Sequence, residues 1–181
     1  IVGTDTIRNG TFLFKRNVGE SGMDQLSLMC RDTDFPPMSL DIYATPGAKI
    51  KVTGTNPLIY TWRVDSPVKE QQEHNRFIED SRDLWDEFQR LAIKERSMRS
   101  ASEAERKALR TKSDSISSII NQRELKLMKE LPISNVWMEK LLRLSMSLKY
   151  NSRFTNKEEI LALYDRLNEE QKASIEGQEI R

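Results

Sequence analysis

Cysteine and histidine are the scarcest reactive residues in this chain, which has one of each among 181 residues: Cys30 and His74. A lone cysteine cannot form an internal disulfide, and one cysteine with one histidine supplies too few ligands for a zinc site. A Cys30–His74 pair is the one cysteine–histidine dyad that the composition allows. The stretch around His74 is strongly polar, so we expect this histidine to face solvent on a helix. We expect Cys30 to be a small, inert residue on a buried strand face.

Glycine-rich loops and long apolar runs are also missing. The seven glycines are scattered and form neither GxGxxG nor a phosphate loop, and no GxSxG sequence marks a nucleophilic serine. Asp32 and Asp34 have a spacing seen in calcium loops, but the required glycine and distal glutamate are lacking, so we expect a surface turn. The residues therefore predict no catalytic, cofactor-binding or metal-binding site.

No sign of charge dominates. The 29 basic residues balance 28 acidic ones, which gives a net charge of +1, so nothing global attracts nucleic acid or an anionic membrane. No apolar run approaches the roughly 18 residues of a membrane span. The chain opens on IVGTD, without methionine or a signal peptide, which is typical of a mature or trimmed chain.

The sequence divides into two halves in which apolar residues recur with different periods, and this division predicts an α+β fold. Residues 1–65 alternate like strands, and Asn9–Gly10 and Pro46–Gly47 are strong turn signals. We expect five or six antiparallel strands in a meander or half-sandwich. The expected strand segments are 5–14 (a hairpin), 25–31, 38–44, 49–54 and 58–64. The expected buried faces are formed by Leu26, Leu28 and Cys30, by Met38, Leu40, Ile42 and Ala44, and by Ile50 and Val52.

From residue 66 to 181 the period is helical, and we expect four to five helices packed closely on the β half. The expected helical segments are 68–98, 102–130, 134–148, 155–167 and one short helix within 168–181. The expected starts are Ser66–Pro67, the Ser102/Glu105 capping box, Ser134 and the Thr155/Glu158 capping box. The expected core residues include Phe77, Leu84, Trp85, Phe88, Leu91, Ile116, Ile119, Ile120, Trp137, Leu141 and Leu144. Gly177 either ends the last helix or allows close packing.

The first two expected helices carry a charge gradient. Acidic residues dominate 65–87 and basic residues dominate 90–112. Acidic residues near the start of the first helix and basic residues near its end complement the helix dipole, and the remaining charges fit the solvated tip of a helical hairpin. The alternative is that the basic tip binds an anionic partner. Few aromatic residues interleave with the basic ones, which argues against single-stranded nucleic acid.

Several stretches together resemble the N-terminal region of thioredoxin-like thiol–disulfide oxidoreductases of the TlpA/AhpC type from Bacteroidetes. The match is carried by PGxxIxVxG at residues 46–54 and SPVKEQxxxxxF at residues 66–77, with support from DTIRNGTFLF, LSLMCRD and FPPMSLDIY. In those proteins a small β domain of the DUF4369 type, here residues 1–65, precedes a helical segment, here residues 66–181. A thioredoxin fold with a WCxxC motif follows. The resemblance covers nearly the whole chain.

The chain departs from that family because it contains no WCxxC. Cys30 does not match the redox motif, so no catalytic residue carries over. The resemblance implies a non-catalytic accessory region on the periplasmic side of the cell envelope, with lipoprotein anchoring as one arrangement. Its implied partners are its own thioredoxin-like domain, client proteins or a second copy. The alternative is a stand-alone envelope module that binds a peptide, a glycan or a protein.

Overall fold

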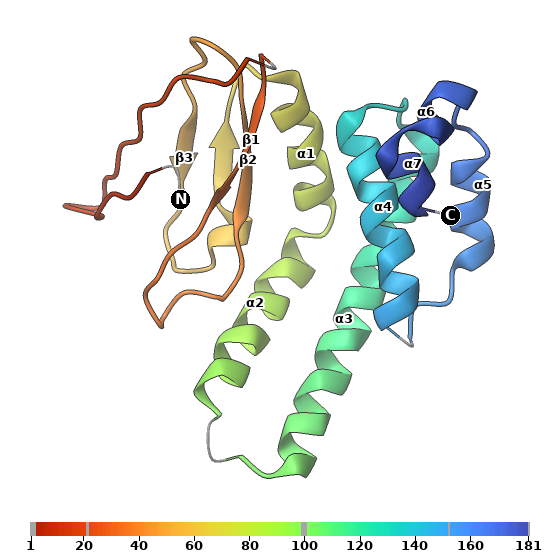
Figure 1. The fold of residues 1–181 in the computed structure, drawn as a ribbon. Helices are drawn as coiled ribbons and strands as arrows, with labels where there is room; N and C mark the ends of the chain where they lie inside the picture. The colour runs from red at the N-terminus through yellow and green to blue at the C-terminus, as the bar shows by residue number, and fades with distance from the viewer. Residues whose placement is uncertain (1–2, 21, 99–100, 152, 181) are drawn as a thin grey trace.

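The computed structural model describes residues 3–20, 22–98, 101–151 and 153–180. The fold is α+β, as the sequence predicts, with four short strands and seven α-helices in those residues. Figure 1 shows the strands on one side of helix α1 (Lys69–Asp80) and the C-terminal helices on its other side. Helix α1 therefore lies between the β half and the rest of the helical region.

The strands in the described residues form two antiparallel sheets of two strands each. Strand β1 (Asp24–Leu28) pairs with β2 (Leu40–Ala44). Strand β3 (Lys51–Thr53) pairs with β4 (Arg63–Asp65). The antiparallel pairing is confirmed, but the expected single meander of five or six strands is replaced by these two separate pairs.

Both predicted turns form. Asn9 and Gly10 have φ of 50° and 72°, and the turn closes a single bridge between Arg8 and Thr11. Beyond that bridge, the described residues on either side of the turn do not continue as paired strands, so the expected N-terminal hairpin is only a turn. Gly47 has φ of 76°, as position i+2 of a type II turn requires.

The expected last strand, residues 58–64, begins instead as a 3-10 helix, η1 (Ile59–Thr61). The Asn56 side chain accepts a hydrogen bond from the Leu58 N–H at 2.9 Å, which starts a turn at this point. Only after this turn does the chain become extended in β4.

Strand β2 is buried on both faces. Leu40 packs with Ile59 and Val64 in a small cluster between the two sheets. Tyr43 lies three residues further on, so it faces the opposite side, where it joins the main helical core. Each of these two side chains is 1% exposed. The sequence pattern predicts the Leu40 face and misses Tyr43, because it assumes a sheet with one solvent-facing side.

The expected helix over residues 68–98 is broken at Ser81 into α1 and α2 (Arg82–Ser97). The Ser81 backbone leaves helical geometry, with φ of −125° and ψ of 24°. Arg123 on the third helix donates a hydrogen bond to the carbonyl of Asp80 at 3.0 Å. A carbonyl at the end of α1 is thereby satisfied by a tertiary contact, which no local pattern encodes.

Two predicted helix starts are confirmed. Helix α3 (Glu103–Glu130) begins with the capping box of Ser102 and Glu105. Helix α4 (Asn135–Tyr150) begins at Ser134, whose hydroxyl accepts a hydrogen bond from the backbone N–H three residues later. In both cases the capping interaction is local, so the sequence specifies it directly.

Two predicted starts are displaced. Helix α1 has Val68 at its N-cap, because the Ser66 hydroxyl accepts from the Val68 N–H at 3.1 Å and forms a turn before the helix. Helix α5 (Lys157–Tyr164) starts after Asn156 rather than Thr155. The expected caps are therefore wrong by one or two residues.

The C-terminal segment forms two short helices, α6 (Glu169–Ala173) and α7 (Ile175–Ile180), which pack against each other. Gly177 is buried where they meet, which favours the close-packing interpretation of this glycine. A Cβ atom at this position would lie 2.1 Å from the backbone oxygen of Gln171.

Gly177→Ala is therefore expected to destabilise the protein by about 1–3 kcal/mol, because backbone would have to move to relieve the overlap. Urea unfolding measures the change. Glu179→Ala, at an exposed position of the same helix, is the control and should stay within about 0.5 kcal/mol. Equal stability of the two variants would contradict the packing of α6 on α7.

Apolar side chains form three clusters in the described residues. The main one joins Tyr43 to α1, α3, α4 and the C-terminal helices, and a second lies between α2 and α3. Ile116 and Ile120 belong to the second cluster, but Ile119 is 44% exposed, so its predicted burial is wrong. Ile119 lies about 100° around the helix from Ile120, away from α2.

In the described residues no helix is long and apolar enough to cross a membrane.

Candidate functional site

The structure places Cys30 and His74 in different surroundings. Cys30 is partly buried against the small cluster that contains Leu40. His74 on α1 is 2% exposed, and its ring lies 5.6 Å from the ring of Tyr43. Because Leu40 and Tyr43 point from opposite faces of β2, Cys30 and His74 lie on opposite sides of that strand and do not form the dyad that the composition allows. Cys30 packs in the same cluster as Leu28, as expected, but it lies two residues beyond the end of β1 and is only partly buried. The expected solvent exposure of His74 is wrong.

The other sequence candidates are structural. Asp32 accepts a hydrogen bond from the Asp34 N–H at 3.1 Å, which makes the expected surface turn. In the described residues no group of three or more His, Cys, Asp or Glu side chains is arranged to hold a metal ion. Three basic side chains of the predicted hairpin pair with acidic ones, as a solvated surface requires. These ion pairs are Arg90–Asp86, Arg110–Glu95 and Lys112–Glu87.

A buried polar cluster between α1, α3 and α4 is the most unusual chemical feature of the fold. It consists of His74, Asn121, Glu124, Lys140 and Arg143, and we call it the interhelical polar cluster. Glu124 is 1% exposed and lies between two cations: it accepts from Arg143, and its other oxygen is 3.6 Å from the Lys140 ammonium. Arg143 also donates to the Asn121 side-chain oxygen at 3.2 Å. Charged side chains as deeply buried as Glu124 and Lys140 are usual in proteins only when they form an ion pair.

His74 completes this cluster without a hydrogen bond to either ring nitrogen. Burial, and then the positive charges of Lys140 and Arg143, lower the pKa of His74 from 6.5 to about 3. The imidazole is therefore neutral at pH 7. A base with so low a pKa is a poor proton acceptor for a thiol near neutral pH.

This lowered pKa predicts acid sensitivity. Because the folded-state pKa of His74 lies below its unfolded value, the unfolded chain binds the proton first, and stability falls as the pH drops from about 6.5 toward 3. The slope from this one group is about 1.4 kcal/mol per pH unit. His74→Leu should remove that part of the pH dependence. Urea unfolding of both proteins at pH 7 and pH 5 measures it, and parallel losses in the two proteins would contradict the assignment.

A second network ties α4 to the β half. The Tyr43 hydroxyl donates to Glu139 at 2.6 Å, and the Tyr43 N–H donates to the Gln71 side chain at 2.8 Å. Burial, followed by the hydrogen bond to Glu139, raises the pKa of Tyr43, so the phenol stays protonated. These contacts fix β2, α1 and α4 relative to one another.

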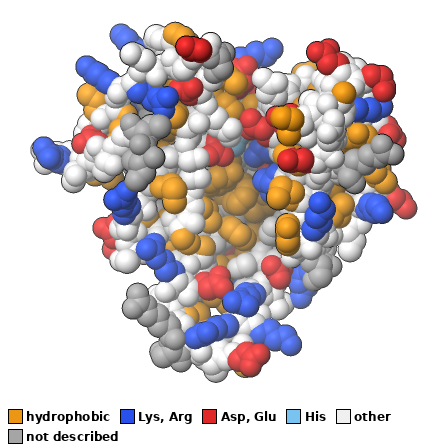
Figure 2. All heavy atoms as spheres, viewed as in Figure 1, with side chains coloured by type: hydrophobic (Ala, Val, Ile, Leu, Met, Phe, Trp, Pro, Cys, Tyr) orange, Lys and Arg blue, Asp and Glu red, His pale blue; other side chains and the backbone are white. Residues whose placement is uncertain are grey.

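Three aromatic side chains from η1 and α2 pack on one another. The Tyr60 ring packs on Trp85 at 4.4 Å, and Trp85 packs edge-on against Phe88 at 5.7 Å. Figure 2 shows a hollow between the two lobes with a hydrophobic floor and with both acidic and basic side chains along its upper edge.

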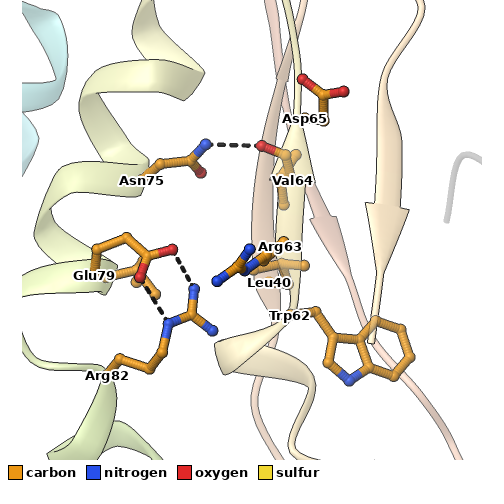
Figure 3. A pocket seen from close by; sticks show the side chains of 9 residues that line it. Leu40, Trp62, Arg63, Val64, Asp65, Asn75, Glu79 and Arg82 are labelled. Atoms are coloured by element: carbon orange, nitrogen blue, oxygen red, sulfur yellow. Dashed lines mark hydrogen bonds and ion pairs between the residues drawn. The ribbon is translucent and has the colours of Figure 1, made fainter. Parts of the chain in front are cut away.

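An open cleft of about 410 Å³ lies between β4 and α1 (Figure 3). Three of its polar side chains, Asn75, Glu79 and Arg82, have hydrogen-bond partners. Asn75 donates to the Val64 carbonyl at 2.8 Å, and Arg82 donates to Glu79 at 2.8 Å. Figure 3 shows these side chains reaching from the helices toward the strand. The Asn75 hydrogen bond therefore joins helix α1 to strand β4 across this cleft.

Sequence reasoning missed the interhelical polar cluster, although a signal was present. Glu124 occupies the α3 stripe that contains Ile120 and Met128, and Lys140 lies beside Leu141 on a helix with a broad buried surface. A charged residue on an otherwise apolar stripe is buried only with a partner. A pair of such interruptions on two neighbouring helices would have predicted an ion pair, but not the histidine that joins it.

Comparisons of the chain with protein-family models, with curated proteins and with solved structures find no match.

Proposed function

We propose that this chain is a non-catalytic accessory region of an envelope thiol–disulfide oxidoreductase, and that it acts by docking proteins. The resemblance described above provides the family context. The observation that carries the non-catalytic part is the separation of Cys30 and His74 by strand β2. Cys30 is separated from the one histidine of the chain, and the pKa of that histidine is too low for a general base near neutral pH, so the parts of cysteine catalysis are lacking.

Exposed apolar residues near the N-terminus support a role in docking. Ile7, Leu13, Phe14 and Met29 are between 46% and 67% exposed. Three of the four lie within residues 7–14, and exposed apolar side chains that form a contiguous patch are typical of surfaces that contact another protein. The partner in this proposal is a thioredoxin-like domain or its client on the periplasmic side of the envelope.

A thiol assay tests the non-catalytic part. The chain should not accelerate insulin reduction by dithiothreitol, and Cys30→Ala should behave identically, with a loss of stability below about 1.5 kcal/mol because the thiol is only partly buried. The readout is insulin turbidity, with a thioredoxin as positive control. Turnover that disappears in Cys30→Ala would contradict the proposal.

The accessory part is tested separately by reading the gene in frame past residue 181. A WCxxC sequence within a following thioredoxin-like domain supports an accessory region. A stop codon at that point contradicts it and favours the stand-alone binding module.

A further inference from the structure

Helix α1 covers one edge of each sheet with an amide side chain. Gln71 accepts a hydrogen bond from the Tyr43 N–H at 2.8 Å and donates to the Asp41 carbonyl at 3.5 Å, so it occupies the outer edge of β2. Asn75 donates to the Val64 carbonyl of β4 at 2.8 Å. An uncovered sheet edge is a template for pairing with another strand, and covers of this kind block it.

The outer edge of β1 has no such cover. In an antiparallel pair, residues directly opposite each other either exchange both backbone hydrogen bonds or point these groups away from each other, in alternation. Tyr43 and Asp41 point theirs toward α1, so the residues opposite them, Gln25 and Ser27, point theirs away from β2. Within the described part of the chain, no other backbone group bonds to Gln25 or Ser27 on that side. Their N–H and C=O groups are therefore open to a further strand.

Strand β1 also lacks the features that keep exposed edges apart. Edge strands of natural proteins commonly carry a lysine, a proline or a bulge, and the three-residue strand β3 has Lys51. The sequence of β1, DQLSL, contains neither lysine nor proline, and its register with β2 is unbroken. Its one charged side chain, Asp24, forms an ion pair with Arg16 at 2.9 Å. No unpaired charge on β1 would repel a second strand.

An apolar pair lies beside this edge. Leu26 is directly opposite Ile42, and the two share the face of the sheet that carries Leu40. The sequence pattern predicts burial of both, but each is only partly buried. Neither belongs to any of the three apolar clusters in the described residues. A strand added at the edge of β1 would remove more of this apolar surface from water.

We propose that β1 pairs with β1 of a second copy of the chain, antiparallel about a two-fold axis at Leu26. Gln25 then lies opposite Ser27 of the partner subunit, and each such pair exchanges both backbone hydrogen bonds. Leu26 meets Leu26 of the partner subunit on the axis, so the two Leu26–Ile42 pairs form one apolar row. The two open residues lie symmetrically about Leu26, which makes the edge complementary to itself and favours a second copy over an unrelated strand. This association is independent of the oxidoreductase context proposed above.

Sedimentation velocity tests the association. The contact is short, which places it among weak interfaces, so the chain should convert reversibly from monomer to dimer between about 10 µM and about 500 µM. Species larger than a dimer are not expected, because a two-fold contact closes on itself. Amide hydrogen exchange locates the contact: the Gln25 and Ser27 amides should exchange more slowly in the dimer than in the monomer.

Variants at the edge make the test specific. Ser27→Pro removes an N–H that the β1–β2 pair does not use, and it should weaken dimerisation at least about tenfold. Ser27→Ala keeps this N–H and should dimerise like the parent chain. If Ser27→Pro unfolds, Leu26→Lys replaces it, because two like charges would then face each other on the axis. Ile119→Lys, at an exposed apolar position of α3, is its control.

Three results would each overturn the proposal. The first is a chain that stays monomeric at about 500 µM, where even weak interfaces associate. The second is a folded Ser27→Pro or Leu26→Lys variant that dimerises as tightly as its control. The third is a dimer in which the Gln25 and Ser27 amides exchange as fast as in the monomer, because the contact would then lie elsewhere on the chain.

Discussion

Glu124→Ala should cost the protein about 3–5 kcal/mol of stability, among the largest effects expected of any single substitution. The carboxylate is 1% exposed and faces both Lys140 and Arg143. Lys140 is itself 5% exposed, so the variant leaves an ammonium group buried beside the Phe77 ring without its counter-charge. Urea unfolding followed by circular dichroism measures the loss.

Two further variants show whether this loss comes from the unpaired charge. Glu159→Ala removes an exposed carboxylate that pairs with Lys129 at 2.7 Å, and it should cost less than about 1 kcal/mol. Replacing Glu124 and Lys140 together by leucine removes both charges and should recover most of the stability lost by Glu124→Ala. If Glu124→Ala were no worse than Glu159→Ala, the ion pair would not be buried as described.

Trp137→Ala is expected to have a comparable effect, a loss of about 3–5 kcal/mol. Trp137 is 0% exposed in the main core, and its indole N–H donates to the Met128 carbonyl at 3.0 Å. The Arg166 guanidinium lies 5.3 Å from its ring. Truncation leaves a large cavity where α3, α4 and the C-terminal helices meet, and thermal or urea unfolding measures its cost.

A conservative change separates cavity from hydrogen bond. Trp137→Phe keeps most of the apolar volume and loses the indole N–H, so it should cost about 1–2 kcal/mol. The Met128 carbonyl retains a second donor, Arg166 at 2.7 Å, which limits that loss. Trp62→Ala, at a partly buried position in the small cluster, should cost less than Trp137→Ala. The reverse order would contradict the location of the main core.

Features of the fold that depend on neighbours in the sequence are those that the sequence predicts. The Ser102/Glu105 capping box and the Ser134 cap involve residues three positions apart, and both form as expected. The turns at Asn9–Gly10 and Gly47 follow from the positive φ that these residues tolerate. Local chemistry of this kind requires no knowledge of the tertiary structure.

Features that depend on distant partners are those that sequence reasoning misses. The break at Ser81 is accompanied by a hydrogen bond from Arg123, more than forty positions along the chain. Tyr43 is buried because α1 and α4 cover a strand face that alternation alone assigns to solvent. His74 is buried because its face of α1 packs against Tyr43 and α4, although the polar composition of residues 70–76 predicts a surface helix. The candidate site escaped prediction because its members come from three separate helices.

We conclude that His74 is a buried, neutral residue of the interhelical polar cluster and not the base of a cysteine dyad. An NMR titration of its imidazole tests this most directly, since the chain has one histidine and its signals need no further assignment. We expect the ring to stay neutral as the pH is lowered through 6 and 5, in line with a pKa of about 3. Titration near pH 6.5, or a pKa that changes in Cys30→Ala, would contradict it.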